Sequence, residues 1–209
     1  MVRIKICGIT NIEDALLVSK LGADALGFVF AESPRRIDVE TGEEINSALP
    51  PFISRVGVFV NEKTETVKAI ASRCRLDILQ FHGSESSNYC NSFSQKIIKA
   101  FRVKDINDLD RLSDYDVNGY LLDTFIDGKP GGTGEVFNWE IGKKAKGFGK
   151  PVILSGGLNP GNVIDAINFV QPYAVDVSSG VEERPGKKDP NKIQAFIKAC
   201  QAASTDFEL

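Results

Sequence analysis

Two side chains that can transfer protons stand at the ends of apolar runs. Cys7 ends the run Val2–Cys7 and precedes Gly8, and Asp123 ends the run Gly119–Asp123. A thiol can act as a general base once its pKa falls toward neutrality, and a carboxylate on an apolar strand is costly to bury without a partner or a task. Both residues also have a structural interpretation, with Cys7 closing the core and Asp123 capping the following loop.

Two segments have the composition of phosphate-binding loops, namely Ser155–Asn159 and Asp176–Gly180. Glycines let backbone N–H groups approach phosphate oxygens, and the start of a helix favours their negative charge. Tight-turn glycines are the alternative. The predicted phosphate-binding residues are Gly156, Gly157, Ser178, Ser179 and Gly180. A third glycine-rich segment, Asp127–Gly134, is typical of a lid or a loop close to phosphate, although a simple connector would have the same composition.

Further polar side chains can bind a substrate. Arg35 and Arg36 follow the run Ala25–Phe30, and an arginine there suits a carboxylate or a second phosphate, while the other of the pair can be a surface charge. Gln80 and His82 stand at the end of another apolar run and can line a pocket. His82, the one histidine of the chain, could instead be a structural polar group.

Short strand-like runs alternate with amphipathic helical segments along the whole chain. The predicted strands are Val2–Cys7, Ala25–Phe30, Arg55–Val60, Leu76–Gln80, Ile97–Val103, Gly119–Asp123, Val152–Ser155 and Ala174–Val177. The predicted helices are Ile12–Leu21, Val39–Leu49, Glu65–Cys74, Ser86–Phe93, Ile106–Leu112, Trp139–Ala145, Val163–Val170 and Ile193–Ala202. This order predicts an α/β fold, a single (β/α)8 TIM barrel over residues 1–209 with a flexible tail at 203–209. A doubly wound open sheet is the alternative.

The barrel prediction brings the candidate residues together. In (β/α)8 barrels the active site lies at the carboxyl ends of the strands, and the loops after strands seven and eight commonly bind phosphate. Alternation along the first strand puts Arg3, Lys5 and Cys7 inside the barrel and the apolar residues between them against the helices. Cys7 is therefore expected at the catalytic rim.

The overall composition argues against several classes of function. A formal net charge of −3 gives no basic face for nucleic acid, and the lysine cluster at Lys143 and Lys144 is expected on a solvated helix face. No segment approaches the roughly 18 uninterrupted apolar residues of a membrane span, and Arg3 and Lys5 interrupt any signal segment, so we expect a soluble cytoplasmic protein. A single histidine and no CxxC pair predict no metal site.

Several motifs together resemble phosphoribosylanthranilate isomerase, an enzyme family of tryptophan biosynthesis. The match is collinear from residue 2 to about Phe196, and Phe81 replaces a leucine found in many relatives, which is a conservative change. The motifs are Lys5–Thr10, Gly27–Phe30, Gly57–Val60, Gln80–Gly83, Leu121–Thr124, Leu154–Leu158, Asp176–Glu182 and Pro185–Asp189. The glycine loops alone would fit many phosphate-binding barrels, whereas the combination is specific.

The resemblance implies an Amadori rearrangement that needs no cofactor. It would convert N-(5-phosphoribosyl)anthranilate into 1-(2-carboxyphenylamino)-1-deoxyribulose 5-phosphate. By the family's motifs, Asp123 is the general acid that opens the ribose ring, and Cys7, as thiolate, is the base that removes the C2 proton. Arg36 would meet the anthranilate carboxylate and Asp176 the sugar hydroxyls. The expected partner is a small phosphosugar, with neither nucleic acid nor membrane, and the protein would be a monomer or a homodimer.

Two other functions are weighed against this one. The sister isomerase of histidine biosynthesis performs the same rearrangement on a larger bisphosphate, with two aspartates and a second phosphate loop. Cys7 in place of an aspartate disfavours it, and so does Gln80–Gly83, which does not repeat the pattern of Ser155–Gly157. A non-catalytic phosphosugar-binding barrel would keep the glycine loops without needing both Cys7 and Asp123.

Overall fold

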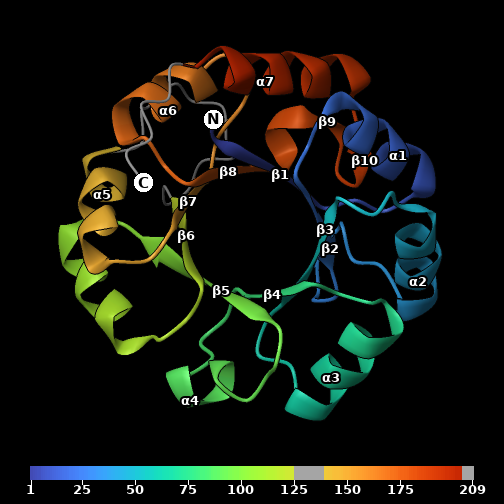
Figure 1. Cartoon of the computed structure of the whole chain (residues 1–209), viewed down its shortest axis with the longest axis horizontal. Coiled ribbons are helices and arrows are strands. Elements are labelled where there is room, and N and C mark those ends of the chain that lie inside the picture. Colours follow the sequence, from blue (N-terminus) through green and yellow to red (C-terminus); the bar gives the residue numbers. More distant parts are fainter. Residues whose placement is uncertain (125–138, 204–209) are drawn as a thin grey trace.

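The computed structural model describes residues 1–124 and 139–203. Within these residues, eight parallel strands follow one another around a closed barrel, and β1 completes the ring by pairing with both β2 and β8 (Figure 1). The strands are β1 (Arg3–Cys7), β2 (Ala25–Val29), β3 (Ser54–Phe59), β4 (Ile78–Phe81), β5 (Lys96–Val103), β6 (Gly119–Thr124), β7 (Val152–Ser155) and β8 (Ala174–Val177). Closure confirms the predicted (β/α)8 barrel and excludes the open sheet, which would leave two strand edges unpaired.

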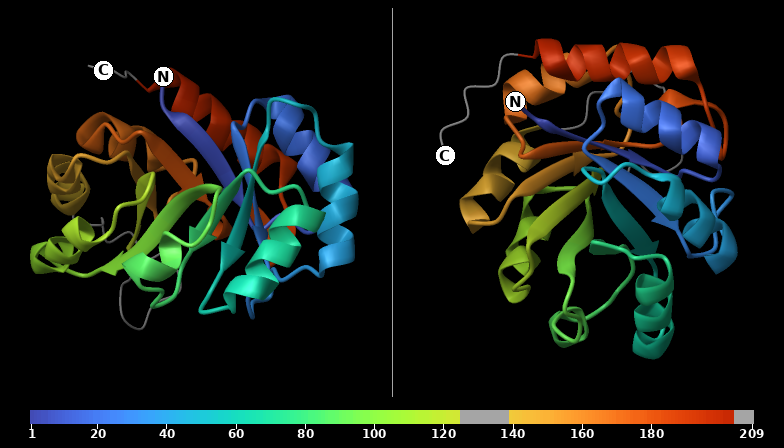
Figure 2. Two further views of the ribbon diagram at one scale, coloured as in Figure 1. Left: turned by 60° about the horizontal axis from the view of Figure 1, so that its bottom comes forward. Right: turned by 45° about the vertical axis from the view of Figure 1, so that its right-hand side comes forward.

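Helices surround the barrel, and α7 packs beside both α1 and α6, so that the last helix meets the first (Figures 1 and 2). The α-helices are α1 (Ile12–Leu21), α2 (Val39–Ala48), α3 (Thr64–Arg73), α4 (Ser87–Cys90), α5 (Trp139–Ala145), α6 (Val163–Val170) and α7 (Pro190–Ala202). The 3-10 helices are η1 (Ile106–Asp114), η2 (Lys146–Phe148) and η3 (Ser179–Val181). A small antiparallel hairpin of β9 (Glu182–Arg184) and β10 (Lys187–Lys188) follows η3.

Two predicted α-helices differ from the observed elements, because η1 is a 3-10 helix and α4 is a single turn. In the segment predicted as Ser86–Phe93, the Ser86 hydroxyl accepts a bond from the Tyr89 N–H, and serine and asparagine side chains compete for backbone groups. The rings of Tyr89 and Phe93 both pack on Phe81. Aromatic contacts therefore hold this connection, and a longer helix is not needed.

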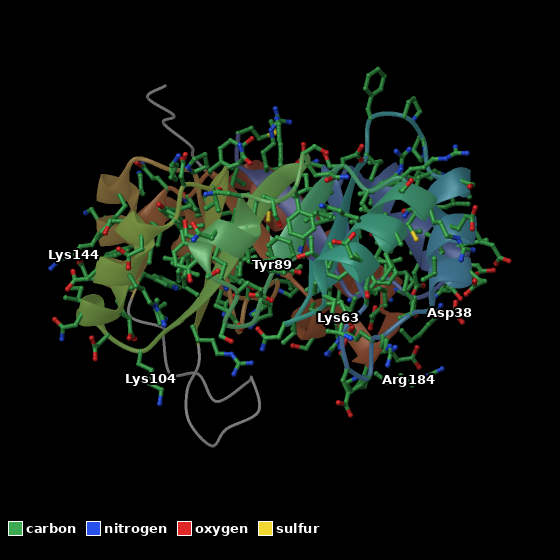
Figure 3. All side chains as sticks on the ribbon, turned by 90° about the horizontal axis from the view of Figure 1, so that it is seen from below. Asp38, Lys63, Tyr89, Lys104, Lys144 and Arg184 are labelled. Carbon is green, nitrogen blue, oxygen red and sulfur yellow. The ribbon has the colours of Figure 1, made fainter. Side chains whose placement is uncertain are left out.

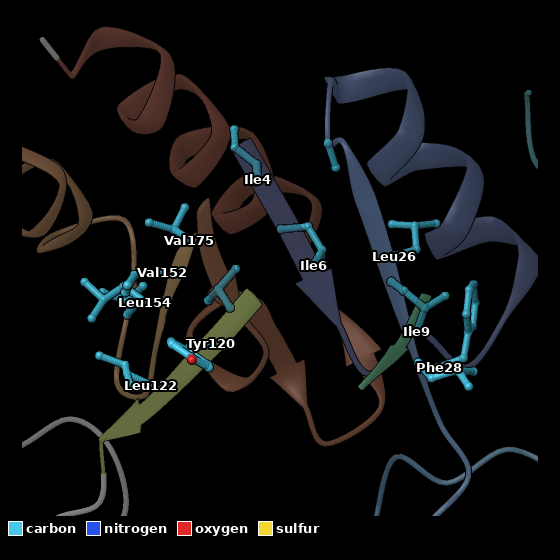
Figure 4. Close-up of a cluster of buried hydrophobic side chains, with 14 of the residues drawn as sticks. Ile4, Ile6, Ile9, Leu26, Phe28, Tyr120, Leu122, Val152, Leu154 and Val175 are labelled. Atoms are coloured by element: carbon cyan, nitrogen blue, oxygen red, sulfur yellow. The ribbon is translucent and has the colours of Figure 1, made fainter. Parts of the chain in front are cut away.

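The strands carry one apolar face toward the helices and another face toward the barrel axis. Ile4 and Ile6 of β1 lie in the large cluster between strands and helices, together with Tyr120 and Leu122 of β6 (Figure 4). Cys7 belongs to a separate cluster with residues of β2 and β3. The alternation predicted for the first strand is therefore confirmed for Lys5 and Cys7, whereas Arg3 at the start of the strand is exposed and pairs with Asp24.

The barrel interior changes from apolar to polar toward the carboxyl ends of the strands. One interior layer contains Ile98, Ala100, Leu121, Ile153 and Ala174. Beyond it, the inward positions of β1, β4 and β8 carry Lys5, Gln80 and Asp176, all of them buried. Burying polar groups is costly unless they are bonded, so this layer marks the end of the barrel where a site would be built.

The outer surface is polar, and side chains such as Lys104, Lys144 and Arg184 point outward (Figure 3). Lys143 and Lys144 are exposed on α5, as predicted for a solvated helix face. No helix in the described parts of the chain is long and apolar enough to cross a membrane.

Two predicted segments fall wholly or mainly outside the described residues. Ala203, the first residue of the predicted tail, is 7% exposed and caps α7 through a backbone bond, so the chain is packed up to this position. The rest of that segment, residues 204–209, and the glycine-rich segment Asp127–Gly134 lie outside the described residues.

Candidate active site

The predicted catalytic residues lie at one rim of the barrel. Cys7 is the last residue of β1, Asp123 is near the end of β6, Gln80 is in β4 and Asp176 is in β8. Leu121 faces the interior, and Asp123 shares that face because side chains two residues apart on a strand point the same way. The closed parallel sheet therefore brings residues from distant parts of the sequence to the same end of the barrel.

A buried ion pair crosses from β1 to β8 inside the barrel. Lys5 and Asp176 are register partners, and Lys5 Nζ lies 2.8 Å from Asp176 Oδ1. Burial alone would lower the pKa of Lys5, but the charges of Asp176 and Cys7 raise it overall, so the lysine stays protonated. The Ser155 hydroxyl donates to the other Asp176 oxygen at 3.3 Å. The alternation along the first strand predicts that Lys5 lies inside the barrel, but the sequence shows no role for it.

Cys7 is packed in a small apolar cluster, and the charges of Lys5 and Lys188 act on it. Its neighbours in the cluster are Val29 and Val58, and Lys5 lies two residues before it on β1. Burial raises the pKa of the Cys7 thiol above its usual value, although Lys5 and Lys188 work in the opposite direction. The pKa of Cys7 therefore moves away from neutrality, because desolvation of the thiolate outweighs the nearby positive charge.

Asp123 is held by a chain of polar side chains from β4. His82 Nε2 lies 3.1 Å from Asp123 Oδ2, and Gln80 Nε2 lies 3.3 Å from His82 Nδ1. With Gln80 donating to Nδ1, the neutral imidazole carries its proton on Nε2 and donates it to Asp123. The side chains of His82 and Asp123 are only partly buried, so a ligand at the rim can reach them. Gln80 Oε1 is buried and has no hydrogen-bond partner among the described residues.

The two predicted phosphate loops lie side by side. Gly156 and Gly157 have positive φ angles of 87° and 66°, a conformation that side chains other than glycine rarely adopt. A Cβ on Gly180 would lie 1.9 Å from the Leu158 carbonyl oxygen, so the loop after β8 touches the loop after β7. The Ser178 Oγ is buried without a hydrogen-bond partner among the described residues. These two loops therefore leave a buried hydroxyl available beside glycine backbone.

The structure distinguishes the two arginines that follow β2. Arg35 donates two hydrogen bonds to the Glu182 carboxylate, at 2.8 and 2.6 Å. Arg36 is exposed, its backbone pairs with Val29 at the end of β2, and its guanidinium forms no hydrogen bond or ion pair with the described side chains. Arg35 is therefore committed within the protein, whereas Arg36 is free to meet an anion at the rim.

Lys188 is a buried residue to which sequence analysis gave no role. Its ammonium is fully buried and donates to the Cys7 carbonyl at 2.6 Å, to Glu182 Oε1 at 2.9 Å and to the Ser178 carbonyl at 3.3 Å. Burial lowers the pKa of Lys188, and Glu182 partly compensates. Lys188 thus joins the end of β1 to the loop after β8. Its only signal in the sequence was its place in the motif Pro185–Asp189.

The described residues contain no group of three or more His, Cys, Asp or Glu side chains arranged to hold a metal ion. The four cysteines, Cys7, Cys74, Cys90 and Cys200, are all buried free thiols.

Comparison with known proteins identifies the family. The family model described as N-(5'phosphoribosyl)anthranilate (PRA) isomerase matches residues 4–199. A curated relative, N-(5'-phosphoribosyl)anthranilate isomerase of Geotalea uraniireducens, is 56% identical over 96% of this chain and 99% of its own length.

Solved structures give the same result. Phosphoribosyl anthranilate isomerase from Thermotoga maritima is 46% identical, with a TM-score of 0.91 over 96% of this chain and 99% of its own. Another solved phosphoribosyl anthranilate isomerase, in complex with reduced 1-(o-carboxyphenylamino)-1-deoxyribulose 5-phosphate, is 45% identical with a TM-score of 0.88, over 96% of this chain and 99% of its own. The barrel, its polar rim and these matches together show that the chain belongs to the N-(5'-phosphoribosyl)anthranilate isomerase family of enzymes.

Proposed function

We propose that Cys7 and Asp123 catalyse the Amadori rearrangement of N-(5'-phosphoribosyl)anthranilate in this barrel, with Cys7 as general base and Asp123 as general acid. The observation that supports these roles is that both side chains share the inward face of the same rim in different environments. Cys7 is buried beside Lys5, whereas Asp123 is partly exposed and bonded to His82. An acid and a base acting on different bonds need such distinct settings.

Asp123 acts first. Its protonated carboxyl transfers a proton to the ribose ring oxygen, the bond from C1 to that oxygen breaks, and the anthranilate nitrogen supplies the electrons that form a Schiff base. The hydrogen bond at 3.1 Å from His82 orients the carboxyl group toward the rim. Asp123 ends this step as a carboxylate.

Cys7 acts second. Its thiolate removes the proton from C2, so that an S–H bond forms and the C2–H electrons become the C1–C2 double bond of an enolamine. The π electrons of the C1–N double bond return to the anthranilate nitrogen, which loses its positive charge. Tautomerisation of the enolamine gives the ketone product, and no electron leaves or enters the substrate. Because burial raises the pKa of Cys7, its thiolate is scarce at neutral pH but is a strong base once formed.

The remaining predicted residues hold the two ends of the substrate. The free guanidinium of Arg36 is suited to the anthranilate carboxylate, and the unpaired Oγ of Ser178 is suited to the phosphate. The unpaired Gln80 Oε1 can accept a bond from a sugar hydroxyl. Asp176 already bonds to Lys5 and Ser155, but a carboxylate has further lone pairs for a sugar hydroxyl.

The test follows the isomerisation of N-(5'-phosphoribosyl)anthranilate by purified protein, with and without a chelator. We expect turnover in both conditions, and loss of turnover in Asp123→Asn with retained affinity for the reduced product analogue. Tight binding of the analogue without turnover by the unmodified protein would favour a binding barrel and refute the proposal.

A further inference from the structure

Lys5, Cys7 and Asp176 form one buried group inside the barrel. Lys5 and Cys7 lie two residues apart on the same inward face of β1, and Lys5 faces Asp176 in register across β8. Gly27 of β2 is the register partner of Cys7. A methyl group on Gly27 would lie 2.7 Å from the Cys7 sulfur and 3.1 Å from Lys5 Nζ, so both atoms border the space that this glycine leaves open.

Lys5 is distinguished from the other charges near the thiol. The charged side chains that face Cys7 are Lys5, Asp176, Lys188 and Arg35. Lys188 and Arg35 are both paired with Glu182, and Lys188 contacts the backbone carbonyl of Cys7 rather than its sulfur. Lys5 is the cation whose Nζ borders the same space as the Cys7 sulfur, and its charge favours the Cys7 thiolate.

We propose that Lys5 is a positioning residue for the general base: its ammonium, anchored by Asp176, holds the Cys7 side chain and stabilises the thiolate. An opposite charge this close favours the ionised form, and more strongly in a buried site than in water. As the thiolate takes the C2 proton, the sulfur loses its negative charge and the Schiff base its positive charge, while Lys5 keeps its own proton. This inference rests on the proposed role of Cys7.

Two substitutions should shift the ionisation of Cys7 in opposite directions. Lys5→Met removes the cation, so the pH midpoint of thiolate formation should rise by roughly 1–3 pH units. Asp176→Asn removes the anion that opposes the thiolate and leaves the cation in place, so the midpoint should fall. A residue that only packs the barrel would not produce shifts of opposite sign.

The experiment titrates the ultraviolet absorbance of the Cys7 thiolate in the substrate-free protein. The difference between each variant and the same variant carrying Cys7→Ser isolates this thiol from the other three cysteines. Lys99→Met is the matched control, because Lys99 is equally buried and paired with Glu85 at 3.2 Å but is not among the charges that face Cys7. Its midpoint should stay unchanged.

Further variants keep the test decisive if Lys5→Met unfolds. Lys5→Arg retains a cation and should restore part of the wild-type midpoint. The double variant Lys5→Met/Asp176→Asn leaves no unpaired charge, and its midpoint should lie above that of Asp176→Asn alone.

We expect the midpoint of thiolate formation to rise from the wild type to Lys5→Met, or from Asp176→Asn to the double variant. The rising limb of kcat against pH should shift by the same amount. Equal midpoints in all folded variants, or shifts of the same sign for Lys5→Met and Asp176→Asn, would overturn the proposal. Wild-type turnover by Cys7→Ser would instead refute the catalytic role of Cys7, while the absorbance titration separately decides whether Lys5 stabilises its thiolate.

Discussion

Replacing the adjacent residues Arg35 and Arg36 with alanine should separate stability from substrate binding. Arg35→Ala removes two charge-assisted bonds, at 2.8 and 2.6 Å, to a Glu182 side chain that is 4% exposed. Removing one partner of a buried ion pair costs about 3–5 kcal/mol. Because Lys188 still pairs with Glu182 and Arg35 is one-fifth exposed, we expect Arg35→Ala to lower the free energy of unfolding by a smaller amount, roughly 2–3 kcal/mol. For a domain of this size that lowers the Tm by roughly 4–12 °C.

Arg36→Ala should have the opposite profile. The Arg36 guanidinium is exposed and forms no bond with the described side chains, so the free energy of unfolding should change by no more than about 0.5 kcal/mol. If it binds the anthranilate carboxylate, losing that bond costs roughly 1.5–3 kcal/mol, which weakens affinity by roughly 10- to 150-fold. Arg36→Lys keeps the charge but loses the bidentate geometry, so its affinity should lie between those of the unmodified protein and Arg36→Ala.

The assay combines thermal unfolding by circular dichroism with calorimetric titration of the reduced product analogue. Arg35→Ala should have a lower Tm and keep most of its affinity for the analogue. Arg36→Ala should keep its Tm and bind the analogue more weakly. A destabilised Arg36→Ala with normal affinity, beside an Arg35→Ala that unfolds normally and binds poorly, would show that the two roles have been exchanged.

Three further predictions use the same assays. Cys7→Ser should fold and bind substrate, but its kcat should fall by roughly a hundred- to ten-thousand-fold, and near-normal turnover would remove the base from the mechanism. The kcat/KM of the unmodified protein should rise with pH above about 7, because burial raises the pKa of Cys7, and Cys7→Asp should flatten that rise. Gly180→Ala should raise KM, because its Cβ would lie 1.9 Å from the backbone oxygen of Leu158, whereas Gly147→Ala, with open space around its Cβ, should not; equal effects on KM would contradict this reasoning. Burial alone would raise the pKa of Glu182, but hydrogen bonds from Arg35 and Lys188 lower it overall. The ionised Glu182 therefore stabilises the fold above its ordinary pKa of about 4.3, and this contribution is lost as the pH falls below that value. Unfolding free energy measured from pH 6 down to 3 should therefore depend less on pH in Glu182→Gln, and an unchanged slope would refute that assignment.

Much of the fold could be predicted because its determinants are local. Alternating strand and helix patterns require a parallel sheet, and the two-residue period of β1 separates Cys7 and Lys5 from Ile4 and Ile6 without knowledge of any partner. The glycines after β7 and β8 are visible for the same reason, since Gly156 and Gly157 are needed for the local backbone conformation.

Local propensity was insufficient where tertiary contacts set the outcome. The segment around α4 has helical spacing, but the contacts of Tyr89 and Phe93 with Phe81 hold it after a single turn. The pKa of Cys7 also depends on its burial and on neighbours from other strands, and for that reason its direction could not be predicted from the sequence.

By itself, the sequence determined the barrel, the rim and the residue types that can do chemistry there, because these follow from periodicity and from the ends of strands. Only the tertiary structure decided which charges meet. Lys5 bonds to Asp176 across 171 positions, Arg35 to Glu182 across 147, and Lys188 to the Cys7 carbonyl across 181. Closure of the sheet places the two ends of the chain side by side, and an ion pair forms only where that geometry brings its two partners within bonding distance.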